Sequence, residues 1–451
     1  MDNARSHPPD ESTNKLRDWL VVGGTALMLF VVFWNVEHDP RFAGSQIAGQ
    51  DEEEIIEGFV DGIDQGSLAR QLGLVGFAAF GLVGLYRTRS RPLVINLASV
   101  SLMLFGLWVV SSVAWSSSPG LSLKRATAYG FLALGMLGMS RVLRPGQLLV
   151  ALLMALTAFT SVSMLLDLAN GAGPWIRDYR FSGTLHPNMQ AMYCGVACLA
   201  AYCLMASGRR TLGRGLFAGL FVLMFLTQSR TCLLALALAM VAVFLLRLNA
   251  RTRWIASMSL VCLLGMAMFV IGSLNTAQVS KARTAALLGR TEKASTLSGR
   301  VPLWEELMND VRRSPMLGYG YEAYWTPEQI EELSQSQQWA MQSAHNAYLE
   351  VTLALGLVGL SLLLAAVVLH LFKAQQAYDA TREPFYAFVY GVLVFALVTG
   401  LLESLFVRMS LPSGIAMLGM CSVGLGAPLA ADKQAAREPA DYGRLAWGGA
   451  A

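Results

Sequence analysis

Apolar runs of about 20 residues recur along the whole chain, and this pattern constrains the fold more than any other feature. A helix of that length crosses the roughly 30 Å hydrocarbon core of a bilayer. Composition agrees, because 55% of the 451 residues are hydrophobic and only 14% are charged, against about 25% in soluble domains. A net charge of only +4 supplies no broad basic surface for nucleic acid. The sequence therefore predicts an all-α, polytopic integral membrane protein.

The apolar runs predict twelve transmembrane helices. They lie near residues 19–36, 68–86, 93–115, 123–140, 147–168, 189–207, 214–228, 231–247, 254–274, 346–372, 384–402 and 411–430. The predicted organisation is a cytoplasmic tail, nine helices, a large external loop, three helices and a second cytoplasmic tail, at 1–18, 19–274, 275–345, 346–430 and 431–451. The first run lacks a signal cleavage site, so we expect it to be an anchor.

Lysine and arginine concentrate in every second connection between the runs. Short cytoplasmic loops retain such residues, so we expect these connections to face the cytoplasm. The groups are Arg5, Lys15 and Arg17; Arg87, Arg89 and Arg91; Arg141 and Arg144; Arg209, Arg210 and Arg214; Arg247, Arg251 and Arg253; Lys373 and Arg382; and Lys433, Arg437 and Arg444. Residues 214–247 are short for two spans, and one long helix is an alternative. Basic residues at both ends require an even number of crossings, which favours a hairpin with Arg230 at its tip.

Two of the external connections are long. Residues 37–67 carry nine acidic residues against Arg41 alone. A divalent-metal site is one interpretation of this segment, and a solvated amphipathic surface helix is the favoured one. Residues 275–345 are long enough for a small layer of short helices outside the membrane.

The loop at 275–345 contains two helical patterns. The first is amphipathic, ends before Pro315 and has its apolar positions at Val301, Trp304, Leu307, Met308 and Val311. The second is polar and covers 327–338. All six cysteines fall within predicted spans, without the spacing of a metal site, so we expect them to pack as small apolar residues.

Ionisable residues gather at the outer ends of the predicted spans, where they are costly unless they face a cavity or a partner. They are Lys124, Arg125, Arg177, Arg180, Arg230, Arg300, His345, Glu350, Glu403 and Arg408. Guanidinium groups bind phosphate and pyrophosphate through paired, charge-assisted hydrogen bonds. The middles of the spans lack charged residues, which disfavours a transporter with a carboxylate proton relay. The residues thus predict an outward-facing site for a phosphorylated, lipid-linked ligand, with His345 as the candidate base.

Several motifs give the chain a family resemblance. SGRVPLWEELMNDVRRSPMLGYGYEAYW, followed by AHNAYLEVTLALGLVGL, resembles the signature of the O-antigen ligase and O-antigen polymerase family of bacterial envelope glycosyltransferases. RFSGTLHPNMQA at 180–191, TQSRT at 227–231 and WSSSPGLSLKRA at 115–126 are also similar. The resemblance covers about residues 90–425, and the order of the motifs makes the set specific.

The resemblance implies a membrane fold of the lipid-sugar-using glycosyltransferase kind, in the bacterial inner membrane, with its active site facing the periplasm. Such an enzyme takes a glycan from undecaprenyl pyrophosphate and transfers it to an acceptor sugar hydroxyl, inverting the anomeric centre without a metal ion or other cofactor. The acceptor is lipid A-core for a ligase or another lipid-linked glycan for a polymerase. A chain-length regulator and a flippase are the protein partners that the resemblance suggests.

By position in the motifs, the family's histidine matches His345, its loop arginine matches Arg300 and its span-tip arginine matches Arg230. The resemblance implies that His345 is the general base and that both arginines stabilise the departing pyrophosphate. Further side chains are expected to bind or orient the substrates, with the aromatic ones stacking on sugar rings. They are Arg180, Arg125, Asn346, Glu350, Trp304 and Tyr319.

Ligase and polymerase share these motifs. The Tyr319-Gly320-Tyr321 stretch and the Trp115-Ser116 pair look more like the branch that polymerises exopolysaccharide, which slightly favours a repeat-unit polymerase. A non-catalytic polysaccharide or lipid transporter, whose outer arginines only hold the ligand, is the alternative from another class.

Overall fold

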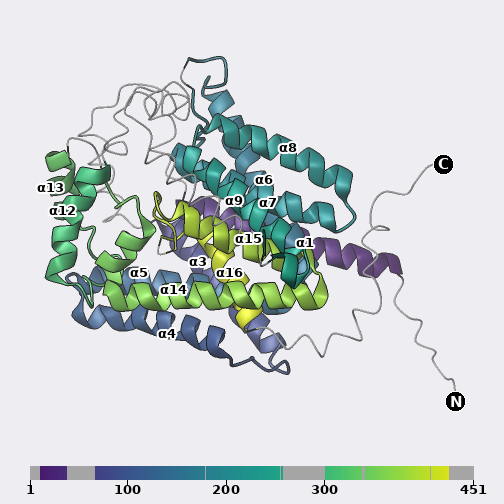
Figure 1. Ribbon diagram of the computed structural model, residues 1–451, viewed down its shortest axis with the longest axis horizontal. Helices are drawn as coiled ribbons and strands as arrows, with labels where there is room; N and C mark the ends of the chain where they lie inside the picture. Colours follow the sequence, from purple (N-terminus) through teal and green to yellow (C-terminus); the bar gives the residue numbers. More distant parts are fainter. Residues whose placement is uncertain are drawn as a thin grey trace.

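The computed structural model describes residues 11–37, 67–177, 179–253, 255–256, 300–337, 341–406 and 408–425. Within these ranges the chain is helical and contains no β-strand (Figure 1). The longer elements are α1 (Glu11–Glu37), α3 (Leu68–Arg87), α4 (Leu97–Ser111), α5 (Pro119–Val142), α6 (Pro145–Ala169), α7 (Pro187–Ala206), α8 (Arg210–Leu226), α9 (Arg230–Leu246), α12 (Arg300–Arg313), α13 (Pro327–Gln337), α14 (Ala347–Thr381), α15 (Pro384–Thr399) and α16 (Leu411–Gly424). A 3-10 turn, η2 (Ser112–Trp115), extends α4.

Eleven of the twelve predicted spans coincide with helices, and the twelfth, at 254–274, lies outside the described residues except for 255–256. Within the described ranges, six helices are long and apolar enough to cross a membrane: α1, α3, α4 with η2, α6, α7 and α14. The helices α9, α15 and α16 are apolar but shorter. The all-α membrane fold is therefore confirmed, whereas the count of twelve crossings stays a prediction. Residues 214–247 form two helices, α8 and α9, so the single long helix is excluded.

Helix starts follow from local sequence signals. Proline, whose fixed φ suits the first turn and whose missing N–H is not needed there, opens α5, α6, α7 and α15. Asn96 caps α4, because its side-chain oxygen accepts hydrogen bonds from the backbone N–H groups of Ala98 and Ser99. These signals set the helix boundaries independently of the apolar pattern.

α7 forms the centre of the bundle and packs against α6, α8, α9 and α15. Its buried face consists largely of small side chains, including Ala191, Cys194, Gly195, Ala197 and Cys198. Small residues let helix backbones approach closely, which is the main way that helices associate in lipid. The cysteine prediction is confirmed for the five cysteines in the described ranges, all of which are free and buried, while Cys262 lies outside those ranges.

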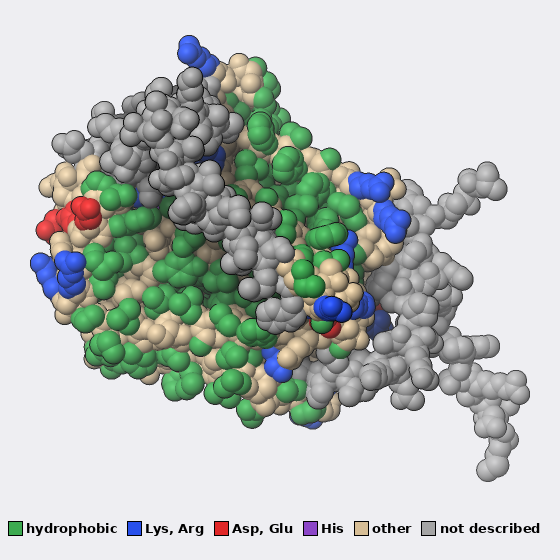
Figure 2. Space-filling view, viewed as in Figure 1, with side chains coloured by type: hydrophobic (Ala, Val, Ile, Leu, Met, Phe, Trp, Pro, Cys, Tyr) green, Lys and Arg blue, Asp and Glu red, His purple; other side chains and the backbone are tan. Residues whose placement is uncertain are grey.

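The basic connections gather at one end of the bundle. Arg209, after α7, lies over the Trp19 ring near the start of α1, and Arg247, after α9, lies over the Tyr202 ring. Beyond α9, the Arg253 side chain forms an ion pair of 2.9 Å with Asp379 near the end of α14. Figure 2 shows Lys and Arg side chains toward the two ends of the long axis and apolar side chains between them. This arrangement is what a helical bundle crossing a bilayer requires.

α14 is broken at Gly356, whose backbone has φ 68° and ψ −174°. The break leaves three carbonyl groups without partners in the helix. Those of Leu353 and Ala354 accept hydrogen bonds from the backbone N–H groups of Tyr319 and Gly320, at 2.8 and 2.9 Å. The carbonyl of Leu355 accepts one from the Trp108 indole N–H at 3.0 Å. Since an unsatisfied peptide group within a membrane is costly, these bonds make the broken helix possible.

A layer of short helices, α12 and α13, covers the other end of the bundle (Figure 1). It has its own apolar core, in which Leu303, Leu307 and Val311 of α12 are buried. The two predicted helices of this loop are thus confirmed. The predicted apolar face of α12 is wrong at Met308, which is 42% exposed, because the helix is rotated so that Leu303 faces the core instead. The acidic segment at 37–67 and residues 275–299 lie outside the described residues, apart from Glu37 and Ser67.

Candidate functional site

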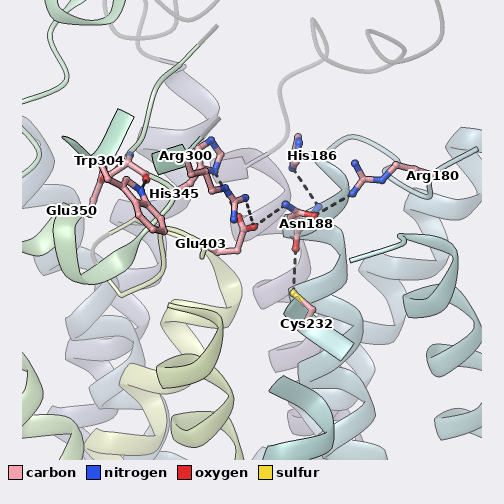
Figure 3. A network of polar contacts seen from close by, with 10 residues as sticks. Arg180, His186, Asn188, Cys232, Arg300, Trp304, His345, Glu350 and Glu403 are labelled. Carbon is pink, nitrogen blue, oxygen red and sulfur yellow. Dashed lines mark hydrogen bonds and ion pairs between the residues drawn. The ribbon is translucent and has the colours of Figure 1, made fainter. Parts of the chain in front are cut away.

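Glu403, in the loop between α15 and α16, lies at the centre of a polar network beneath α12 (Figure 3). Its Oε1 atom accepts hydrogen bonds from Nη2 of Arg300 at 3.0 Å and from Nδ2 of Asn188 at 2.7 Å. Its Oε2 atom lies 3.8 Å from Nδ1 of His345. The side chain of Glu403 is only 5% exposed, so its carboxylate depends on these partners for compensation. One carboxylate thus joins three segments that are far apart in the chain.

Asn188 continues the network toward the connection between α8 and α9. It lies in the first turn of α7, where its side-chain oxygen accepts a hydrogen bond from Nη2 of Arg180 at 3.2 Å. The Nε atom of Arg180 donates to the carbonyl of Thr227 at 3.1 Å. His186 caps α7, because its Nδ1 atom accepts a hydrogen bond from the backbone N–H of Asn188. The motif at 180–191 therefore forms one wall of the site.

His345 adopts a left-handed backbone conformation, with φ 47°. Three other non-glycine residues at the end of the helical bundle that carries the network adopt the same conformation: Gln228, Glu322 and Phe406. Such conformations cost of order 1–3 kcal/mol each and persist where the surroundings enforce them, which is common at functional sites. The backbone strain therefore coincides with the polar network.

Hydrogen bonds to Glu350 and Trp304 fix the position of the segment that carries His345. The backbone N–H of Ala344 donates to Oε2 of Glu350 at 2.8 Å, and the Trp325 indole donates to Oε1 of the same carboxylate at 2.6 Å. The Trp304 indole donates to the carbonyl of Ala344 at 2.8 Å. Glu350 and Trp304 thus hold the backbone next to His345 and contribute to the site through its position.

The remaining predicted site residues lie outside the Glu403 network. Arg125 contacts the carbonyl of Glu322, and its Nε atom lies 3.9 Å from Oε2 of that residue. Asn346 caps α14 through its side-chain oxygen. The Tyr319 hydroxyl donates to the carbonyl of Asp310. Arg230 begins α9, and no hydrogen bond or ion pair of its guanidinium group is found within the described part of the chain.

Aromatic side chains of the short-helix layer serve mainly in packing. Tyr321, Tyr324 and Trp325 are buried, with 1, 5 and 6% of their surface exposed, and are therefore not available to stack on a sugar ring. Trp304 and Tyr319 are half-buried against the same core, and both make hydrogen bonds to backbone carbonyls. Their expected contact with sugar rings stays a prediction.

Two residues of the network were not among the predicted site residues. Glu403 stood in the set of outer ionisable residues, and Asn188 lies within the HPN part of the motif at 180–191. Because cations outnumber carboxylates at the outer ends of the spans, a carboxylate there is expected to pair with one of the arginines, and this signal could have identified Glu403. The sequence did not show which of the arginines this carboxylate would meet.

The electrostatics of the network favour a charged Glu403. Burial of this side chain favours its neutral form, but the contact with His345 and the positive charge of Arg300 outweigh burial and hold the pKa of Glu403 below its usual value. The carboxylate can therefore anchor Arg300 and orient the imidazole ring at neutral pH.

This ionisation predicts a pH-dependent stability. Between the lowered pKa in the folded state and the usual value of 4.5, the unfolded chain binds the proton more readily, so lowering the pH favours unfolding. The stability advantage of the wild type over Glu403→Gln should be fully present above pH 4.5 and shrink below it. Thermal unfolding of both proteins in detergent across this range measures the difference. Glu331→Gln, an exposed carboxylate on α13, serves as the control, and an advantage that does not shrink would contradict the assignment.

Neither a metal centre nor the cavity between α4 and α5 coincides with the network in the described part of the chain. In the described ranges, no group of three or more His, Cys, Asp or Glu side chains is placed to hold a metal ion. A cavity of about 850 Å³ between α4 and α5 is lined mostly by apolar side chains, and no residue of the network lines it. The candidate site is therefore defined by the polar network.

Comparison with known proteins gives two matches. Residues 215–364 match a family model described as O-antigen ligase, and this range contains Arg230, Arg300 and His345. The exopolysaccharide production protein ExoQ of Rhizobium meliloti (strain 1021) is 27% identical over 216 residues. That alignment covers 46% of this chain and 44% of ExoQ, so the chain spans less than half of the length of the relative it matches. Together with the apolar helices, these matches support a relationship between this chain and the O-antigen ligase-related membrane proteins.

Proposed function

We propose that this protein is a metal-independent, inverting glycosyltransferase of surface polysaccharide synthesis. It transfers a glycan from undecaprenyl pyrophosphate to an acceptor sugar hydroxyl at the periplasmic face of the bacterial inner membrane. Polymerisation of lipid-linked repeat units is the preferred reaction. The family match supports a polysaccharide ligase or polymerase at a coarse level, and the name of the relative refers to exopolysaccharide production, which agrees with the exopolysaccharide branch.

The observation that carries this proposal is the convergence of a histidine and two arginines on one buried carboxylate. Arg300 and His345 both face Glu403, and Arg180 reaches it through Asn188 (Figure 3). An imidazole beside guanidinium groups suits a reaction in which a hydroxyl loses a proton while a pyrophosphate departs. A protein that only holds its ligand has no need of an oriented base.

In the proposed reaction, His345 removes the proton of the acceptor hydroxyl. Glu403 faces Nδ1, which favours the tautomer with its proton on that atom and the basic lone pair on Nε2. The acceptor oxygen then forms a bond to the anomeric carbon from the face opposite the pyrophosphate. The bond between that carbon and the pyrophosphate oxygen breaks, and its electron pair leaves with the pyrophosphate. One inversion of the anomeric centre results.

Arg300 is proposed to stabilise the negative charge that develops on the leaving pyrophosphate, together with Arg230 and Arg180. Its side chain is 15% exposed, so one guanidinium group can contact Glu403 and a ligand from different edges. Its anchoring to Glu403 fixes the direction of the remaining donors before the substrate binds. Pre-oriented donors stabilise a developing charge better than mobile ones, because they need no reorganisation during the reaction.

A ligase that attaches the glycan to lipid A-core is the second candidate, and it is favoured by the description of the matching family model. The purified protein in vesicles containing a lipid-linked repeat unit distinguishes the candidates. A ladder of longer glycans together with free undecaprenyl pyrophosphate is expected for the polymerase. Transfer that occurs only after lipid A-core is added would identify the ligase.

Two substitutions in α12 form a matched pair for this assay. Arg300→Gln removes a guanidinium group from the network, and removal of one charge-stabilising donor typically slows catalysis by about 10²–10³-fold. Arg312→Gln removes an exposed guanidinium group from the far end of the same helix and should leave the rate unchanged. Retained lipid binding without any glycan transfer by the wild type would overturn the enzymatic proposal in favour of a transporter.

A further inference from the structure

A second group of charged side chains borders the segment that carries His345. Arg125 contacts Glu322, and Arg70 at the start of α3 interacts electrostatically with the carboxylates of Glu322 and Glu37 and with Arg125 and Arg408. Arg408 donates from Nη2 to the side-chain oxygen of Gln342 at 3.2 Å, three residues before His345. We call Arg70, Arg125, Arg408 and Glu322 the Arg70 cluster. Three guanidinium groups from α3, α5 and the loop before α16 thus lie near one another, with Glu322 beside Arg70 and Arg125 and with Glu37 beside Arg70 and Arg408.

The Arg70 cluster and the Glu403 network share two chain segments. Arg408 follows Glu403 by five residues in the same loop, and Gln342 lies in the segment of His345. Arg408 also interacts with Glu350, which holds the backbone next to His345. Figure 3 shows Glu350 on the opposite side of His345 from Asn188 and Arg180. Arg408 of the cluster therefore adjoins the segment of His345 through Gln342 and Glu350.

The Arg70 cluster is as accessible as the Glu403 network. The side chains of Arg125 and Glu322 are 20 and 17% exposed, against 23% for His345 and 15% for Arg300. Glu322 itself adopts a left-handed backbone with φ 50°, which turns its carbonyl toward Arg125. Arg125 and Glu322 are therefore as open to solvent as the residues of the Glu403 network.

The guanidinium groups of the cluster are incompletely satisfied within the described residues. The ion pair between Arg125 and Glu322 measures 3.9 Å, which is beyond hydrogen-bond range. No hydrogen bond of the Arg70 guanidinium group is found in this part of the chain, although Arg70 is only half-exposed. Partly buried donors without acceptors cost free energy, and an anion with several oxygens can satisfy them together. The cluster thus has the donors and the accessibility of an anion site.

We propose that the Arg70 cluster binds the pyrophosphate of a second lipid-linked substrate, the acceptor, while Arg300 binds that of the donor. This inference rests on the proposed polymerase function. Joining two lipid-linked glycans brings two pyrophosphates to the membrane surface, and only the donor's is released. The acceptor keeps its own, which needs separate charge compensation. Separate arginine groups for the two pyrophosphates keep the two lipids apart while their glycans meet at the base.

Geranylgeranyl pyrophosphate, a short prenyl pyrophosphate, is the probe for this proposal. Native mass spectrometry of the full chain in detergent counts the bound molecules. Two are expected for the wild type, and one each for Arg300→Gln and for the double variant Arg70→Gln, Arg125→Gln. Arg312→Gln should retain two, and geranylgeraniol, which has no phosphate, should not displace them. Titration of the double variant should show at least a roughly tenfold loss of affinity at one site and none at the other.

The outcomes separate this inference from the proposed function. Two molecules bound to the double variant at wild-type affinity would overturn the inference, whatever Arg300→Gln does. One molecule bound to the double variant and two to Arg300→Gln would support the Arg70 cluster and contradict the proposed role of Arg300. Arg125→Lys keeps the charge but loses the planar fork, and its intermediate affinity would show that a loss in the double variant is not caused by misfolding.

Discussion

Replacing His345 with alanine is expected to reduce glycan transfer by about 10²–10⁴-fold, the range that a general base usually contributes. The physical reason is that a sugar hydroxyl is a poor nucleophile unless its proton is removed during attack. The imidazole lies beside Glu403, the carboxylate that also holds Arg300. The rate of polymer formation from a lipid-linked repeat unit, at saturating substrate, measures the effect.

Two controls separate chemistry from assembly in this experiment. His345→Gln retains polar side-chain atoms but cannot act as a base near neutral pH, so it should be as inactive as the alanine variant. Both variants should still bind the prenyl pyrophosphate probe, because the arginines are unchanged. Wild-type output from His345→Ala would remove the histidine from the mechanism and leave the network as a binding site.

Gly356→Ala is expected to destabilise the protein and to abolish transfer without touching a polar residue of the site. The backbone there, with φ 68° and ψ −174°, is essentially accessible to glycine alone, and other residues pay of order 1–3 kcal/mol for it. A Cβ atom would also clash with the carbonyl of Met316. The helix would then straighten or detach from Tyr319 and Gly320, which displaces the half-helix that carries His345 at its start.

Gly106→Ala in α4 is the matched control for this substitution. No atom lies within 4 Å of a Cβ atom built at Gly106, so alanine should be neutral or stabilise the helix by about 0.5–1 kcal/mol. Thermal unfolding and transfer rate are measured for both variants. Equal stability and activity of the two would mean that the break in α14 has no part in positioning His345.

Much of the helical framework was predictable because it follows from local sequence properties. Apolar runs give the helices, and proline and asparagine set where several of them begin. The spacing of basic connections correctly divided residues 214–247 into two helices. The rotation of α12 was less predictable, because Leu303 and Met308 are both apolar and only the position of the neighbouring core decides between them.

The sequence by itself determined that this is a helical membrane protein, where most of its helices lie, and which side chains at their outer ends can bind a ligand or act in catalysis. Only the tertiary structure decided how those side chains are grouped: Glu403 joins His345, Arg300 and Asn188, whereas Arg125 belongs with Arg70. The physical reason is distance along the chain. Periodicity and charge act over a few residues, but the partners of Glu403 lie up to 215 residues away and meet only when the helices pack.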